Sequence, residues 1–333
     1  MDPIELTRAL VARESPTFAE GPVMDYIAVA LERAGWRVTL QQVSPGRENV
    51  YAFREPPAVV FSTHLDCVPP FVPFREDDEW LYGRGVCDAK GIAAAMVAAA
   101  ERLAQEGERR IGLLFVVGEE NGSDGALAAD RLEPKGRFLI NGEPTENRLS
   151  IGQKGSLRVD FEAEGRAAHS AYPDEGHSAI DPLLDTLERL RRLPLPSDPL
   201  LGPSTLNIGT IEAGVAPNVI PPHAKAQVHF RTVGPTVELK RQIDAALGPG
   251  VVVTASVEIP AYKSAAPVGW DTTFVAFASD LPFLSAWGRG YQLGPGTIRV
   301  AHSSEERIRK ADLLRGVDLY VKLATDLLAE DPS

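Results

Sequence analysis

The sequence has 333 residues, of which 44% are hydrophobic and 24% charged, and its formal net charge is −12 at pH 7. This length and balance indicate a globular chain of about two domains. The negative charge disfavours nucleic acids and anionic membranes as partners, because both repel an acidic surface.

The cysteines and the terminal segment bear on cellular location. The two cysteines, Cys67 and Cys87, are too few for a disulfide framework and favour a reducing compartment. The first residues lack the pattern of a signal peptide, and no apolar run approaches the roughly 20 residues that span a bilayer. We therefore expect a cytoplasmic protein without a membrane segment.

The first 150 residues predict helices alternating with buried strands. Helical spacing of apolar residues covers residues 3–11 and about 22–34, and alternation over residues 36–40 predicts a strand. Residues 58–63 and 111–117 are almost wholly apolar, as in strands covered on both faces, and the alanine-rich segment 89–106 between them predicts a helix. Strand, helix and strand in this order predict a parallel α/β sheet.

The pattern changes after about Gly152. Strands are predicted at residues 156–164, 205–211, 224–231 and 251–257, and helices at 178–193 and 236–247. This order matches a ferredoxin-like α+β unit, in which two helices cover one face of an antiparallel sheet. A final helix is predicted over about 305–328. The chain is therefore predicted to form an α/β domain of residues 1–153 and 262–333, with an inserted α+β domain of residues 154–261.

Two candidate functional segments are residues 64–66 and residues 83–88. His64 and Asp66 lie two positions apart at the end of a buried strand, so their side chains point to the same side, where Asp66 could orient the imidazole. Asp88 opens the alanine-rich helix, and an ordinary helix cap is the alternative reading. An acid at this position argues against a dinucleotide fingerprint for residues 83–88, because it would repel a pyrophosphate.

Further acids and a histidine follow later apolar runs. Glu119 and Glu120 repel each other unless a cation holds them, and a metal with one acid as ligand and its neighbour as base explains the pair; a solvated acidic turn is the alternative. Together with His64, Asp88, Glu143 and His302, these residues fall at successive ends of a parallel sheet, where open α/β sheets bind ligands. Nitrogen and carboxylate ligands suit zinc, with cobalt or manganese as alternatives.

These motifs resemble those of the M20 metallopeptidases, in the branch of acetylornithine deacetylase, succinyl-diaminopimelate desuccinylase and carboxypeptidase-like enzymes. The matching segments are residues 64–66, 83–91, 119–120, 142–145 and 301–306, in family order over nearly the whole chain. The resemblance implies two divalent metal ions bridged by Asp88, with His64 and Glu143 in one site and Glu120 and His302 in the other. It also implies that Glu119 is the general base and acid and that Asp66 orients His64.

The resemblance further implies that the inserted domain is a lid that forms a homodimer. Its His169 would stabilise the oxyanion of an active site, in the same chain or in the partner. Asn218, Arg231, Gly294 and Gly296 match substrate-contacting positions, although a turn asparagine, a strand-end arginine and tight-turn glycines are common without such a role.

The implied function is hydrolysis of the amide bond of an N-acyl amino acid, a small-molecule substrate, as in acetylornithine deacetylase. A glutamate at position 143 is more usual in deacylases and carboxypeptidases of the family than in its aminopeptidases. The alternatives are a succinyl-diaminopimelate desuccinylase, a dipeptidase or a carboxypeptidase. An inactive relative that acts as a binding protein is a different class, and the presence of all five ligands and Glu119 disfavours it.

Overall fold

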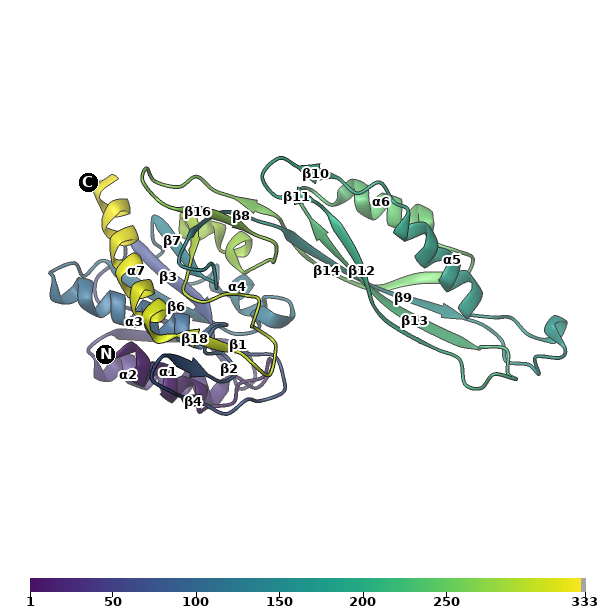
Figure 1. Ribbon diagram of the computed structural model, residues 1–333, viewed down its shortest axis with the longest axis horizontal. Coiled ribbons are helices and arrows are strands. Elements are labelled where there is room, and N and C mark those ends of the chain that lie inside the picture. The colour runs from purple at the N-terminus through teal and green to yellow at the C-terminus, as the bar shows by residue number, and fades with distance from the viewer. Residues whose placement is uncertain (331–333) are drawn as a thin grey trace. The chain divides into compact units, whose positions relative to one another are not determined.

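The computed structural model describes residues 1–330, and these divide into two compact units (Figure 1). Unit 1 comprises Met1–Ile151, Lys263–Thr273 and the described residues from Ser279 onward, and unit 2 comprises Gly152–Tyr262 and Phe274–Ala278. The predicted boundaries placed residues 274–278 in the first domain, whereas the structure groups them with unit 2. One long-range backbone contact joins this segment to unit 2, since the Lys154 amide donates to the Val275 carbonyl at 3.1 Å.

A mixed sheet runs through unit 1, and its main strands lie in the order β1-β2-β6-β3-β7-β17-β8. β3 is parallel to β6 and β7, and β17 is parallel to β7, whereas β1, β2 and β8 run antiparallel to their neighbours. The predicted α/β class with a largely parallel sheet is thus confirmed. The bounds are β1 Arg37–Ser44, β2 Arg47–Phe53, β3 Val59–His64, β6 Ile111–Val116, β7 Phe138–Gly142, β8 Leu149–Gln153 and β17 Arg289–Leu293, with short β15 Tyr262–Lys263 and β16 Thr272–Val275 beside β8.

The helices of unit 1 pack around α3 (Lys90–Gln105). Every residue of α3 from Lys90 to Ala100 is buried, and its alanines allow α1 (Pro3–Val11) and α7 (Lys310–Glu330) to approach closely. The remaining elements of unit 1 are α2 Gly21–Arg33, α4 Asp124–Ala129, the 3-10 turns η1 Glu119–Asn121 and η3 Leu281–Trp287, and a small sheet of β4 Arg75–Glu76, β5 Trp80–Tyr82 and β18 Arg307–Arg309. The last helix was predicted from residue 305 and in fact begins at Lys310, because residues 307–309 pair with β5 instead.

Unit 2 has its own sheet and its own core. Four antiparallel strands lie in the order β12-β13-β9-β14, with bounds β9 Gly155–Glu164, β12 Thr205–Ala213, β13 His223–Thr232 and β14 Val251–Ile259. The alternate residues Leu157, Val159 and Phe161 of β9 are buried together with side chains of α5 (Ile180–Arg191) and α6 (Val237–Ala246). The 3-10 turn η2 Pro173–Glu175 and the hairpin of β10 Ser197–Asp198 and β11 Gly202–Pro203 complete the unit.

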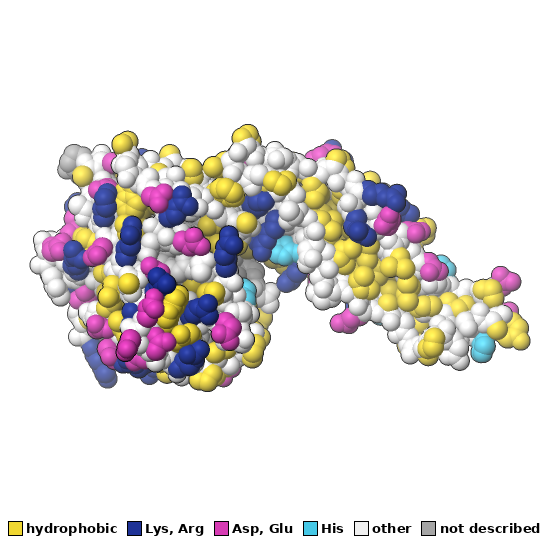
Figure 2. All heavy atoms as spheres, viewed as in Figure 1, with side chains coloured by type: hydrophobic (Ala, Val, Ile, Leu, Met, Phe, Trp, Pro, Cys, Tyr) yellow, Lys and Arg dark blue, Asp and Glu magenta, His cyan; other side chains and the backbone are white. Residues whose placement is uncertain are grey.

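Charges of both signs are interspersed on the face of unit 1 shown in Figure 2. Ion pairs of unit 1 such as Arg8–Glu76, Arg309–Glu79 and Lys310–Glu76 bring opposite charges together on its surface. Within residues 1–330, none of the helices combines the length and the apolar character that crossing a membrane requires.

Candidate metal centre

The candidate ligands converge at the carboxyl ends of the parallel strands of unit 1. His64 is the last residue of β3, Glu120 lies in η1 shortly after β6, and Glu143 directly follows β7. Asp88 lies two residues before α3, and His302 lies in the loop after β17. Because parallel strands end at one edge of the sheet, residues far apart in the chain come together there.

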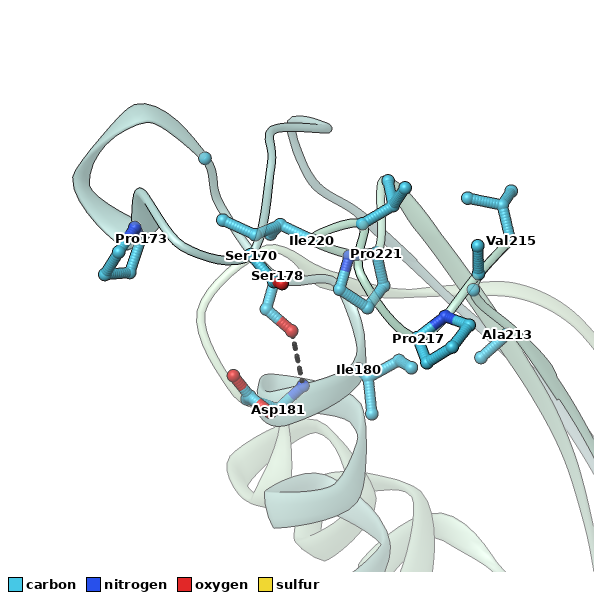
Figure 3. Close-up of a pocket in the computed structure, with 14 residues that line it drawn as sticks. Ser170, Pro173, Ser178, Ile180, Asp181, Ala213, Val215, Pro217, Ile220 and Pro221 are labelled. Atoms are coloured by element: carbon cyan, nitrogen blue, oxygen red, sulfur yellow. Dashed lines mark hydrogen bonds between the residues drawn. The ribbon is translucent and has the colours of Figure 1, made fainter.

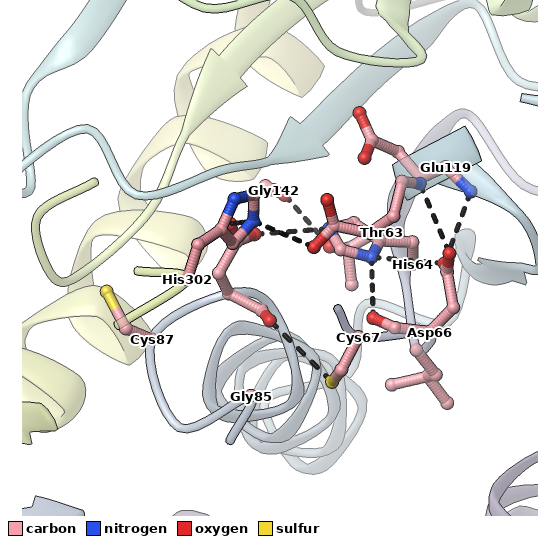
Figure 4. A network of polar contacts seen from close by, with 12 residues as sticks. Thr63, His64, Asp66, Cys67, Gly85, Cys87, Glu119, Gly142 and His302 are labelled. Carbon is pink, nitrogen blue, oxygen red and sulfur yellow. Dashed lines mark hydrogen bonds and ion pairs between the residues drawn. The ribbon is translucent and has the colours of Figure 1, made fainter. Parts of the chain in front are cut away.

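These five side chains form two clusters that share Asp88. One cluster contains His64, Asp88 and Glu143, the other contains Asp88, Glu120 and His302, and in each cluster the ligand atoms lie within 4.8 Å of one another. Figure 4 shows the two histidines, His64 and His302, in the network of polar contacts around the site. Nε2 of His64 is 3.2 Å from Oδ1 of Asp88, and Nε2 of His302 is 3.4 Å from Oδ2 of Asp88 and 3.0 Å from Oε1 of Glu120. The two oxygens of Asp88 thus face different histidines, as a carboxylate that bridges two cations requires.

The residues present fit divalent metal ions. Oε1 of Glu143 is buried and lacks a hydrogen-bond partner among the described residues, and a buried carboxylate oxygen is costly without a proton or a cation. Imidazole nitrogens together with carboxylate oxygens are the donor set that zinc takes in catalytic sites. We infer from the donor set and from this oxygen that the cluster is built to hold cations.

The electrostatics of the cluster also favour cations. Burial raises the pKa of the carboxyl groups of Glu119, Glu120 and Glu143, and their negative neighbours add to this shift. For Asp88, burial acts in the same direction, but hydrogen bonds from His302 and His64 outweigh it and lower the pKa. Three carboxyl groups therefore resist ionisation in the metal-free site, and bound cations would remove that resistance.

Asp66 joins the His64 ligand to the turn that carries the two glutamates. Its Oδ1 lies 3.3 Å from Nδ1 of His64, and it accepts hydrogen bonds from the backbone amides of Glu119 at 3.2 Å and Glu120 at 3.1 Å. The hydroxyl of Thr17 donates to Oδ2 of Asp66 at 2.8 Å. The Asp66 carboxylate therefore fixes the ring of His64 and the backbone of the Glu119–Glu120 turn at once.

Glu119 is placed beside both clusters but belongs to neither. Its side chain is half-buried, and the groups with the largest electrostatic influence on it are His64 and Glu143. His302, in contrast, reaches the site from the solvent side, with a side chain that is 49% exposed. Its backbone has φ +62°, a conformation that non-glycine residues adopt at a cost and that occurs often at functional sites.

Two residues near the centre were missed by the sequence analysis. Thr17 lies 49 positions before Asp66, and no pattern marked it as a partner. Asp280, directly before η3, is a fully buried carboxyl group whose burial raises its pKa to about 7, and it acts electrostatically on Glu119 and Glu143. A lone acid in a loop has no sequence signal that separates it from a surface residue.

The predicted glycine-rich loop lies against the metal cluster. A Cβ atom on Gly294 would come within 2.4 Å of the Glu143 carbonyl oxygen. One on Gly296, where φ is +83°, would come within 2.6 Å of Sγ of Cys87. These glycines are therefore required by close backbone packing beside Glu143 and the Asp88 loop.

Of the site residues predicted in unit 2, two lie together and one lies apart. The Ser170 amide donates to the Asn218 carbonyl at 3.0 Å, and His169 forms a bridge with Val219. Asn218 precedes β13, which begins at His223, whereas Arg231 lies near the end of that strand. Eight residues of extended strand separate His223 from Arg231 by about 26 Å. The structure thus separates His169 and Asn218 from Arg231 within the unit.

A cavity of about 700 Å³ lies next to His169 and Asn218 in unit 2 (Figure 3). Its walls include the apolar residues Val215, Pro217 and Ile220, while the Ser178 hydroxyl accepts a hydrogen bond from the Asp181 amide at 3.3 Å on one side. The cavity therefore lies beside the two segments of unit 2 that contain His169 and Asn218, two of the three functional residues predicted in this unit.

The chain belongs to the peptidase family M20/M25/M40, whose model matches residues 60–326. It is 40% identical to a peptidase M20 domain-containing protein of Schizosaccharomyces pombe over 96% of this chain and 83% of that protein. It is 37% identical to an Aspergillus flavus protein named "Probable carboxypeptidase", over 95% of this chain and 85% of that protein. The fold is that of an M20 family metallo-carboxypeptidase of Sulfolobus solfataricus, with a TM-score of 0.81, 14% identity and coverage of 98% and 99% of the two chains.

Proposed function

We propose that this chain is a two-metal hydrolase that cleaves the amide bond next to a free carboxylate in a short peptide or an N-acyl amino acid. The observation that carries the proposal is the pair of three-residue clusters that share Asp88, with Glu119 beside both and outside each. A single shared carboxylate between two histidines is the arrangement expected of a dinuclear site.

Glu119 is the group that moves protons in this proposal. Two divalent cations, zinc by the donor set or else cobalt or manganese, would lower the pKa of a water molecule and polarise the carbonyl of the substrate. The carboxylate of Glu119 takes the proton from the attacking water and then passes it to the leaving amine nitrogen. Asp66 holds the backbone of Glu119 during both transfers, through the 3.2 Å hydrogen bond to its amide.

The names of the relatives favour peptide substrates cleaved at the carboxyl end. The Aspergillus flavus protein and the Sulfolobus solfataricus structure are both called carboxypeptidases. Glu143 is compatible with this class and equally with deacylases, so deacetylation of an N-acetyl amino acid such as acetylornithine is the second candidate. Removal of a succinyl group and cleavage of dipeptides are variants of the same reaction.

The proposed substrate contacts come from residues of both units. We assign the α-carboxylate of the substrate to Arg231 of unit 2 and to the loop of Gly294 and Gly296 in unit 1. We assign oxyanion contacts to His169, with Asn218 beside it, in the same chain or in the partner. A homodimer formed through unit 2 is part of the proposal. It is supported by the edge position of β12, by the exposed side chain of Ile211 on that strand, and by the exposure of His169. Light scattering of the purified protein tests it, and a mass of one chain at all concentrations would refute the dimer.

The function is tested with a panel of N-acetylornithine, N-succinyl-diaminopimelate, dipeptides and longer peptides, each with a free or an amidated carboxyl terminus. The protein is loaded with zinc, cobalt or manganese, and a chelated sample serves as the control. We expect hydrolysis only of substrates with a free carboxylate and only after metal loading. Full activity after exhaustive chelation would refute the metal model, and equal rates on amidated peptides would refute the carboxylate requirement.

A further inference from the structure

A further buried carboxylate, Glu306, lies four residues after His302 and contacts the loop that leads to Asp88. Its Oε1 accepts three backbone hydrogen bonds, from the amides of Gly85 at 2.9 Å, Cys87 at 3.1 Å and Asp88 at 3.2 Å. Its Oε2 accepts a hydrogen bond from Nη1 of Arg84 at 2.7 Å. The side chains of Glu306 and Arg84 are 0% and 4% exposed, so solvent does not substitute for these contacts.

These contacts define the path of the loop before Asp88. Three amides within four residues, among them the amide of Asp88 itself, donate to one oxygen atom of Glu306. These three hydrogen bonds set the backbone orientation of the loop. The backbone carbonyl of Glu306 accepts a fourth bond, from the Gly83 amide at 3.2 Å. Gly85 has φ +92°, and a Cβ atom there would come within 2.9 Å of Sγ of Cys67, so the loop is also confined on its other side.

The same residue is joined to His302 by a short, ordered segment. The Ser303 hydroxyl donates to the Val300 carbonyl at 2.7 Å and accepts from the Glu305 amide at 3.2 Å, which forms a compact turn between His302 and Glu306. Asp88 and His302 are far apart in the sequence but are both tied to Glu306, one by direct hydrogen bonds and the other through this turn.

We propose that Glu306 is a positioning residue that sets the separation of Asp88 and His302, and with it the metal affinity of the cluster of Asp88, Glu120 and His302. The inference rests on the proposed metal site. It assigns Glu306 no contact with substrate. Residues that hold metal ligands in place typically change metal affinity 10–100-fold when they are removed.

The competing explanation is that Glu306 and Arg84 form a buried ion pair that stabilises the fold alone. Removing one partner of such a pair leaves an unpaired buried charge and is strongly destabilising, whereas replacing both partners by apolar groups is often neutral. Variants that remove Glu306, Arg84 or both should therefore show whether metal affinity changes independently of fold stability.

The experiment compares the parent protein with Glu306→Ala, Arg84→Met and the double variant. Metal affinity is measured by competition with a chromophoric zinc chelator, and stability by urea unfolding of the metal-free proteins. Glu101→Ala is the matched control: Glu101 pairs with Arg54 at 2.8 Å and lies eleven residues after Lys90 on α3, roughly 16 Å along the helix.

We expect Glu306→Ala to bind one of its two zinc ions about 10–100-fold more weakly than the parent. Arg84→Met should keep the parent affinity, because Oε1 of Glu306 still accepts the three amides. The double variant should regain stability relative to Glu306→Ala but keep its weak binding. Glu101→Ala should lose stability and bind zinc as the parent does.

Two results would overturn the proposal: parent affinity in Glu306→Ala, or recovery of affinity together with stability in the double variant. The second outcome would show that the pair acts on the fold alone. If the parent protein fails to bind zinc, the metal site itself is refuted, and the role of Glu306 with it. If the parent protein binds zinc and Glu306→Ala binds it with the same affinity, only the role of Glu306 is refuted.

Discussion

The division of labour between Glu119 and Glu120 is tested by Glu119→Gln. Glutamine has the same shape and keeps the backbone amide that donates to Asp66 at 3.2 Å, so the turn should stay in place. Glu119 lies outside both ligand clusters, and therefore the metal content should not change. The amide side chain cannot accept the proton of the attacking water. We expect a rate loss of about 10²–10⁴-fold in kcat, which corresponds to about 3–5 kcal/mol of transition-state stabilisation.

The neighbouring variant Glu120→Gln is the matched control. Its side chain belongs to the cluster with Asp88 and His302, and Oε1 lies 3.0 Å from Nε2 of His302. It should lose bound metal as well as activity, whereas Glu119→Gln should lose activity alone. The measurements are kcat on the best substrate of the panel and metal content by elemental analysis. A near-parental rate in Glu119→Gln, or equal metal loss in both variants, would refute the assignment.

Three further predictions concern protonation, a supporting hydrogen bond and the independence of the units. Hydrogen bonds to Asp88 and Glu120 raise the pKa of His302 to about 10 in the metal-free protein, so it is protonated at pH 7 and must lose that proton to bind a metal. Calorimetry in buffers of different ionisation enthalpy should therefore show proton release and an affinity that rises with pH below about 10; binding without proton release would contradict this. Thr17→Val should lower the free energy of unfolding by about 1.5–3 kcal/mol, because it removes a donor to a buried carboxylate, and an unchanged urea midpoint would count against the contact. Phe161→Ala should cost unit 2 about 3–5 kcal/mol by opening a cavity, and it should leave zinc affinity unchanged if the ligands all lie in unit 1.

Local sequence patterns predicted the elements that depend on local interactions. The first helix was predicted at residues 3–11 and is observed at Pro3–Val11, where Oδ1 of Asp2 accepts the amides of Ile4 and Glu5 as a helix cap. The buried strands were recognisable because both faces of each are covered, which leaves a continuous apolar run.

The elements that were missed depend on distant partners. β18 turns residues 307–309 into a strand because they pair with β5, more than 200 positions earlier, and no local pattern contains that partner. β2 follows β1 through a turn at Gly46, where φ is +74°, and its sequence mixes charged and apolar residues in a way that hides its burial.

The candidate site shows the same distinction between what is local and what is distant. His64 and the Glu119–Glu120 pair were predictable because each lies at the end of a recognisable strand. The carboxyl ends of parallel strands lie at the same edge of the sheet, where ligands bind. Thr17, Asp280 and Glu306 act through contacts with segments far away in the chain, and their residue types are common on surfaces.

Two buried carboxylates outside the ligand set, Asp66 and Glu306, hold different parts of the centre. Asp66 holds His64 and the turn of Glu119 and Glu120, whereas Glu306 holds the loop of Asp88 and is joined to His302. Asp88 is the member that both clusters share, because its two oxygens face His64 and His302. A disturbance at Asp66 should therefore reach Glu119 directly and both clusters through His64 and Glu120. A disturbance at Glu306 should reach Asp88 and His302, while the turn of Glu119 and Glu120 keeps its hydrogen bonds to Asp66. Because Asp66, and not Glu306, accepts the amide of Glu119, the roles of the two supporting carboxylates can be measured independently.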